Sequence, residues 1–193
     1  MGQINLKLIG FAIGVFLLCV PSAFAESTDS IPAPKYDMCI KTGDIIYKEL
    51  YDRLDKKYTP FTMANDAEYV GVTHKYFKKF NKWYLSFVGK QLVASYKKNN
   101  GKHPEEAYDC DNHARLYKSM MSFASLTGKS PNRELLVGII MVEQKHKQLG
   151  IRAEGAHALN LVHTDKGWIV FEPQTGEFCK LSEYKNSIYS YIF

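Results

Sequence analysis

The chain has 193 residues, of which 46% are hydrophobic, 13% aromatic and 23% charged. This composition suits one globular domain and excludes a long disordered chain, a collagen-like repeat and a coiled-coil rod. The 25 basic and 20 acidic residues are mixed along the chain and give a net charge of +5, so no basic tract indicates a nucleic-acid partner.

The first 25 residues have the pattern of a secretory signal peptide. Lys7 precedes the uncharged residues 8–20, and Pro-Ser-Ala-Phe-Ala then ends at Ala25 with the small residues that a signal peptidase needs. The apolar run is shorter than the roughly 20 residues of a membrane-spanning helix, so an uncleaved anchor is the lesser alternative. We therefore expect cleavage after Ala25, export to the periplasm or the extracellular space, and no stable membrane anchor.

The mature chain divides into a short arm and one domain. Residues 26–40 are rich in Pro and Ser and predict a mobile arm, and residues 41–193 predict a single domain. At the start of that domain, Ile46, Leu50 and Leu54 recur at a spacing of four, which predicts an amphipathic helix that ends before Pro60.

A second helix is predicted over residues 65–98, with a break near Gly89. Its aromatic side chains recur at helical spacing beside several lysines. Stacking on nucleic-acid bases is one interpretation of this pattern, but an aromatic stripe with a solvated basic face is the ordinary pattern of a core helix. We expect the aromatic residues to lie in the core.

The second half predicts one helix followed by strands. Asp109-Cys110-Asp111-Asn112 has helix-start residues, and Gly128 ends the segment. Strands are predicted over residues 134–142, 157–163 and 168–173, and the last two form an antiparallel hairpin. The order indicates an α+β fold in which N-terminal helices and a core helix pack on one face of a small antiparallel sheet.

Three cysteines remain after cleavage, so at least one is unpaired or bridges two chains. Cys39 and Cys179 lie near the two ends of the domain, where a disulfide could join them. Two unrelated buried thiols are the alternative. Cys110 lies apart from both, at the start of the predicted core helix.

Cys110 is the candidate nucleophile, because a helix N-terminus favours a thiolate while a neighbouring base is still needed. If His163 pairs with Trp168 in the hairpin, His157 and Glu172 share a face as diagonal neighbours, about 7–8 Å apart at the backbone. Glu172 is then the residue that orients the imidazole. Gln174, directly opposite His157, is the second possible orienter.

Three segments carry a family resemblance. They are Cys-Asp-Asn-His-Ala from Cys110, Gly-Ala-His-Ala-Leu-Asn around His157, and Gly-Trp-Ile-Val-Phe-Glu-Pro around Glu172. Together they resemble the transglutaminase-like and papain-like cysteine peptidase superfamily over about residues 105–177. The resemblance implies a papain-like or transglutaminase-like fold, a catalytic triad of Cys110, His157 and Glu172, and hydrolysis or acyl transfer at a peptide or protein amide, with no cofactor.

Two other interpretations of these residues remain. Cys110, His113 and His157 could ligate zinc, although no second ligand pair has finger-like spacing, and we expect no metal. The chain could also be a non-catalytic secreted binding or scaffold protein that retains the fold. The sequence does not indicate an oligomeric state.

Overall fold

The structure is a computed structural model that describes residues 30–57, 61–64, 68–89, 109–126, 133–151 and 155–193. The predicted signal peptide lies outside these residues. The compact unit begins at Ile31, and it is the part considered below.

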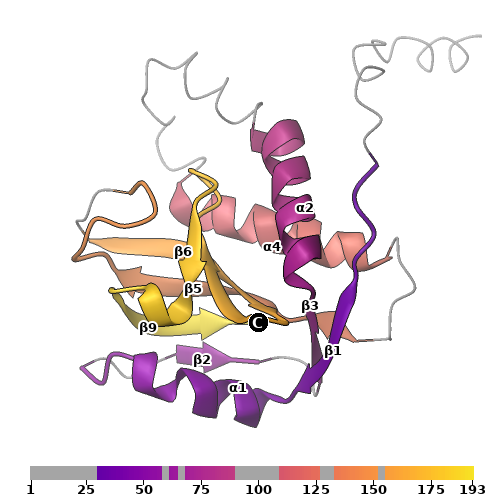
Figure 1. Cartoon of the computed structure of the whole chain (residues 1–193). Coiled ribbons are helices and arrows are strands. Elements are labelled where there is room, and N and C mark those ends of the chain that lie inside the picture. Colours follow the sequence, from indigo (N-terminus) through magenta and orange to yellow (C-terminus); the bar gives the residue numbers. More distant parts are fainter. Residues whose placement is uncertain (1–29, 58–60, 65–67, 90–108, 127–132, 152–154) are drawn as a thin grey trace, which may run out of the picture. The chain divides into compact units, whose positions relative to one another are not determined.

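The described residues of this unit form three α-helices and nine strands (Figure 1). The helices are α1 (Gly43–Leu50), α2 (His74–Tyr84) and α4 (Cys110–Leu126). Short helical turns cover Tyr51–Arg53, Leu85–Gly89 and Leu181–Glu183. The strands are β1 (Tyr36–Lys41), β2 (Phe61–Met63), β3 (Tyr69–Val72), β4 (Glu134–Leu135), β5 (Val137–Glu143), β6 (Ala156–Thr164), β7 (Gly167–Phe171), β8 (Phe178–Lys180) and β9 (Ser187–Ile192).

The strands form one mixed sheet, and the prediction of a small antiparallel sheet is wrong. The main order is β1-β3-β6-β5-β9-β2. In addition, β4 pairs with β3, β7 pairs with β6, and β8 pairs with β7. The pairs β2–β9, β3–β4 and β3–β6 are parallel. Parallel pairs join segments far apart in the chain, so hairpin patterns in the sequence do not show them.

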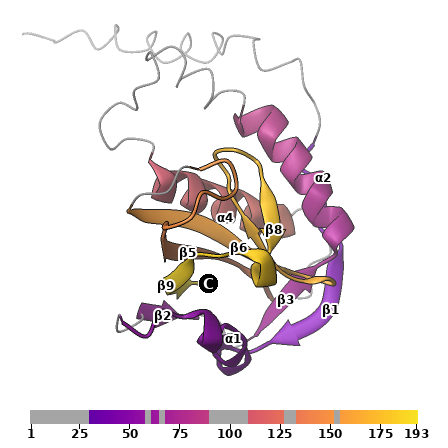
Figure 2. The same cartoon turned by 60° about the vertical axis from the view of Figure 1, so that its left-hand side comes forward.

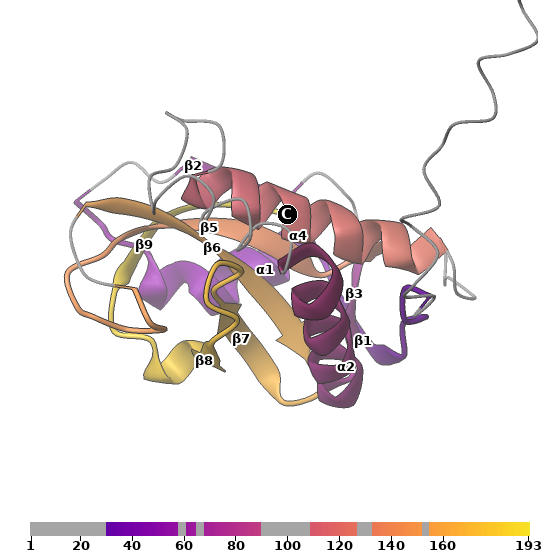
Figure 3. The same ribbon diagram turned by 90° about the horizontal axis from the view of Figure 1, so that it is seen from above.

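Helices cover both faces of the sheet, which corrects the expected packing on one face. One core cluster joins Leu50 of α1 to Leu159 and Leu161 of β6, and another joins Tyr117 of α4 and Phe77 of α2 to Val162. The views in Figures 2 and 3 place α1 on the side away from α4. Eight consecutive residues of β6 are buried, which is the pattern of a strand covered on both faces.

The N-terminal half contains strands where the sequence predicted an arm and a helix. Residues 36–41, at the end of the expected arm, form β1, which pairs with β3. All four residues of β3 are buried, so the strand shows no alternation that could have separated it from the helix that follows. Helix α2 begins after Thr73, whose hydroxyl accepts a hydrogen bond from the Tyr76 amide at 3.2 Å. The described helical segment runs to Gly89, and the predicted continuation to residue 98 lies outside the described residues.

The C-terminal hairpin has the predicted register. His163 pairs with Trp168, and Asn160 pairs with Phe171. In this register, His157 and Glu172 fall on the same face of the sheet as Leu159, as expected. The helix prediction for α4 is also confirmed, since Ala114, Tyr117, Met121 and Ala124 are all fully buried.

Candidate functional site

Helix α4 begins at the candidate thiol. The Asp109 carboxylate accepts hydrogen bonds from the backbone and side-chain nitrogens of Asn112 at 3.4 and 3.1 Å, and the Asp109 carbonyl accepts one from the His113 amide at 3.2 Å. These contacts fix the first turn of the helix in the manner of an N-cap. Cys110, the first residue of the helix, is partly exposed.

Asp109 and Asp111 flank the Cys110 thiol, and their carboxyl groups interact with each other and with Arg115. The contact with Asp111 lowers the pKa of Asp109, and the contact with Asp109 raises the pKa of Asp111. Asp111 also forms an ion pair with Arg115 at 2.9 Å, one turn along the helix. Arg115 therefore partly offsets the negative charge of Asp111, which by itself would oppose a thiolate at Cys110.

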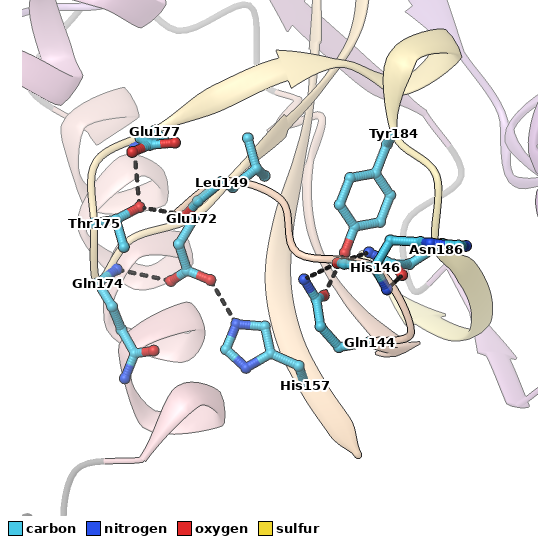
Figure 4. Close-up of polar contacts among 10 residues, drawn as sticks. All are labelled: Gln144, His146, Leu149, His157, Glu172, Gln174, Thr175, Glu177, Tyr184 and Asn186. Atoms are coloured by element: carbon cyan, nitrogen blue, oxygen red, sulfur yellow. Dashed lines mark hydrogen bonds and ion pairs between the residues drawn. The ribbon is translucent and has the colours of Figure 1, made fainter. Parts of the chain in front are cut away.

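His157 and Glu172 form a direct buried contact. His157 Nε2 lies 2.5 Å from Glu172 Oε2 (Figure 4). The Glu172 side chain is fully buried and that of His157 is only 9% exposed. The diagonal placement predicted from the hairpin register thus leads to a hydrogen bond, because a glutamate side chain is long enough to span the offset.

The charge state of His157 follows from its partners. Burial is the largest single influence on the pKa of His157 and lowers it. Hydrogen bonds to Cys110 and Glu172, together with the charges of both residues, outweigh burial and raise the pKa from 6.5 to about 9. The ring is therefore protonated at neutral pH. Since Nε2 contacts Glu172, Nδ1 is the ring atom left for the thiol.

Gln174 contributes through its backbone. Its amide donates a hydrogen bond to Glu172 Oε1 at 2.8 Å, whereas its side chain points away from His157 (Figure 4). Gln174 therefore holds the carboxylate, and Glu172 is the residue that orients the ring.

The disulfide prediction is wrong. The Cys179 thiol is free, and Gln148 Nε2 lies 3.6 Å from its sulfur. Burial raises the pKa of Cys179 to about 11. Cys39 lies in β1, which pairs with β3, whereas Cys179 lies in β8, which pairs with β7.

Three residues around the site were missed or assigned a lesser role. Asn160 donates from Nδ2 to the carbonyls of Ala114 and Gly138 at 2.9 and 3.2 Å and so ties α4 to the sheet. Burial, with a smaller effect of the Glu172 charge, raises the pKa values of Tyr84 and Tyr184. Tyr84 belongs to the aromatic stripe predicted as core, and nothing in that pattern indicates its proximity to Glu172.

The zinc alternative gains no support from the side-chain positions. Within the residues described, no group of three or more His, Cys, Asp or Glu side chains could hold a metal ion. His113, expected at the surface, is buried on α4 with 8% exposure.

The cluster of Cys110, His157 and Glu172 is thus a fixed polar site at one end of β6. A buried carboxylate holds a protonated ring, and a partly exposed sulfur lies beside that ring. Such a site presents a fixed positive charge and a polarisable sulfur to a ligand.

Comparisons with known proteins add information on the fold. No protein-family model and no curated protein matches the chain. A solved structure described as the PSL1a-E64 complex matches with a TM-score of 0.50 and 20% identity, over 80% of this chain and 50% of that one. The Polyporus squamosus lectin, bound to the human-type influenza-binding epitope Neu5Aca2-6Galb1-4GlcNAc, matches with a TM-score of 0.51 and 19% identity, over 80% of this chain and 49% of the lectin.

These matches show a likeness of fold, and the chain spans about half the length of either structure. They correct the expected membership of the transglutaminase-like and papain-like superfamily, since a lectin is the described neighbour. They also correct the predicted function. At 19–20% identity the matches show a likeness of fold alone, and they do not support the predicted thiol hydrolase, peptidase or acyltransferase.

Proposed function

We propose that the protein is an exported binding protein whose ligand is a glycan, held at the cluster of Cys110, His157 and Glu172. The observation that carries the proposal is the contact of 2.5 Å between His157 and the fully buried Glu172, which fixes a positively charged ring beside the partly exposed Cys110. A glycan carboxylate is attracted to such a charge.

The likeness to the lectin supports a glycan over a peptide ligand. That lectin is described as bound to a sialylated trisaccharide, whose sialic acid carries a carboxylate. No comparison supports a peptide amide substrate for this chain. The role of the cluster as the binding site is our proposal from its geometry.

Export is part of the proposal and depends on the first 25 residues. Across the described ranges, no helix combines the length and apolar character needed to cross a membrane. We propose the periplasm or the extracellular space as the site of action.

Calorimetric titration of the mature chain with Neu5Acα2-6Galβ1-4GlcNAc tests the proposal. We expect saturable binding that weakens at least about tenfold in Glu172→Gln, because the ring loses the carboxylate that keeps it charged. Glu49→Gln, the same substitution at the opposite end of β6, is the matched control and should bind as the wild type does. Absence of saturable binding would overturn the proposal.

E64 is the second probe, because the similar PSL1a structure is described as its complex. We expect the intact mass of the denatured protein to stay unchanged after incubation with E64 near neutral pH. A gain in mass that disappears in both Cys110→Ala and His157→Ala would show a thiol activated by the ring and would overturn a purely non-covalent binding role.

A further inference from the structure

The turn between β7 and β8, residues 172–177, holds the Glu172 carboxylate. The Glu172 amide donates to the Glu177 carbonyl at 2.9 Å, and the Gly176 amide donates to the Glu172 carbonyl at 2.8 Å. The Gln174 amide donates to Glu172 Oε1 at 2.8 Å. The turn therefore determines where Oε2 lies, and Oε2 is the atom that contacts His157.

The Thr175 hydroxyl connects this turn to the loop that follows β5. It donates to the Leu149 carbonyl at 2.9 Å and accepts from the Glu177 amide at 3.2 Å (Figure 4). The two segments also pack closely, because a Cβ atom at Gly150 would lie 3.0 Å from Thr175 Cγ2. The backbone φ is 54° at Leu149 and 73° at Gly150, so this loop bends sharply to reach the hydroxyl.

The loop after β5 is itself well anchored. The Asn186 side-chain oxygen accepts hydrogen bonds from the amides of Lys145 and His146 at 2.9 and 2.8 Å. The Tyr184 hydroxyl donates to Gln144 Oε1 at 2.9 Å in a buried contact. The loop thus offers Thr175 a fixed point of attachment.

The opposite side of the turn packs against the end of α2. Gly176 has a φ of 80°, and a Cβ atom there would lie 2.6 Å from Leu85 Cδ1. The turn is therefore confined by Leu85 on one side and tied by the Thr175 hydroxyl on the other. Of these two restraints, the hydroxyl is the one that can be removed without changing the shape of the side chain.

We infer that Thr175 is a positioning residue for the site: its hydroxyl ties the 172–177 turn to the loop after β5 and so holds the Glu172 carboxylate against His157. The inference rests on the proposed function, but its test measures the protonation of the His157 ring and not the binding of a ligand. Failure of glycan binding and failure of this inference are therefore distinguishable.

The test is the protonation of His157, followed by NMR as a function of pH in three variants. Thr175→Val removes the hydroxyl and keeps the shape, and we expect the proton affinity of His157 to fall at least about tenfold, one pKa unit. Thr175→Ser restores the hydroxyl and should restore the wild-type value. An unchanged His157 titration in Thr175→Val would overturn the inference.

Thr164→Val is the matched structural control. Thr164 lies at the β6–β7 turn, where its hydroxyl donates to the Gly167 carbonyl at 3.0 Å and accepts from the Lys166 amide at 3.2 Å. We expect a similar loss of thermal stability in Thr164→Val and Thr175→Val, with the His157 titration changed in the latter alone. Should Thr175→Val not fold, Thr175→Ala gives the same readout, and an unchanged titration there equally overturns the inference.

Discussion

The two ends of β6 each carry a histidine near a glutamate, in different surroundings. At one end, Glu172 is fully buried and contacts His157 directly. At the other end, Glu49 is partly exposed. Its two oxygens accept hydrogen bonds from Lys41 at 2.6 Å and from the Trp168 indole at 2.8 Å. His163 meets the Trp168 ring edge-on, with the centroids 4.9 Å apart.

The two carboxyl groups therefore differ in their hydrogen-bond partners: Glu172 contacts an imidazole and a backbone amide, whereas Glu49 contacts a lysine and an indole. Burial tends to raise the pKa of Glu49, but hydrogen bonds to Lys41 and Trp168 outweigh it and lower the pKa, and the charge of His163 contributes least. The Glu49 charge is thus balanced by a lysine. The Glu172 charge has His157 as its partner, which is why the functional site is assigned to that end.

The largest expected effect is on the pKa of His157 in Glu172→Gln. Without the carboxylate, burial still lowers the pKa of the ring and only Cys110 still raises it, so we expect the pKa to fall from about 9 towards the ordinary value near 6.5. Histidine ring signals followed by NMR across pH 4–10 measure this shift. Glu49→Gln should leave the His157 titration unchanged, and a His157 shift of similar size in that control would remove the distinction between the two ends.

The next effect concerns Asn160, which lies between the two ends and ties β6 to α4. Asn160→Ala leaves the carbonyls of Ala114 and Gly138 without this donor in a fully buried position. We expect the free energy of unfolding to fall by about 2–4 kcal/mol, measured by urea unfolding. A loss below about 0.5 kcal/mol would mean that this amide does not hold the helix to the sheet.

Stability should depend on pH through His157. Because its pKa is raised in the folded protein, the ring contributes stability that is fully present below about pH 6.5, the unfolded value, and is lost as the pH rises through about 9. After allowance for partial screening, we expect the loss to be about 1–2 kcal/mol. Urea unfolding at pH 6 and pH 9.5 measures it, and Glu172→Gln should lack this loss. Equal pH profiles in both proteins would contradict the assignment.

The smallest effect is expected at the other end of the strand. Trp168→Phe removes the indole donor to Glu49 but keeps an aromatic ring in the core, so we expect a loss of about 0.5–1.5 kcal/mol in thermal unfolding. The pKa of Glu49 should rise, since one of the bonds that lowers it is lost. A change in the His157 titration in this variant would show that the two ends are coupled.

The parts of the structure that the sequence predicted are those with local patterns. The four-residue turn from Thr164 to Gly167 determined the β6–β7 register, and that register placed Glu172 diagonally to His157. The buried stripe of α4 followed from helical spacing in the same way. The predictions of the hairpin register and of helix α4 used only residues that lie close together in the sequence.

The remaining features depend on contacts between distant segments. The parallel pairing of β2 with β9 joins residues near 61 to residues near 190, and no local pattern indicates such a partner. Strand β9 was not predicted, and β3 was assigned to a helix because Tyr69 continues the aromatic spacing of the helix that follows. The hydroxyl of Thr175 had no distinguishing feature in the sequence, since its role depends on the Leu149 carbonyl 26 residues away.

The most direct test of the proposed binding site is NMR of the mature protein during titration with Neu5Acα2-6Galβ1-4GlcNAc. We expect the His157 ring signals and the Cys110 and Gln174 amides to shift in a saturable manner, while the signals of His163 and Trp168 stay in place. Saturable shifts confined to another surface, with His157 unchanged, would contradict the assignment of the binding site to this end of β6.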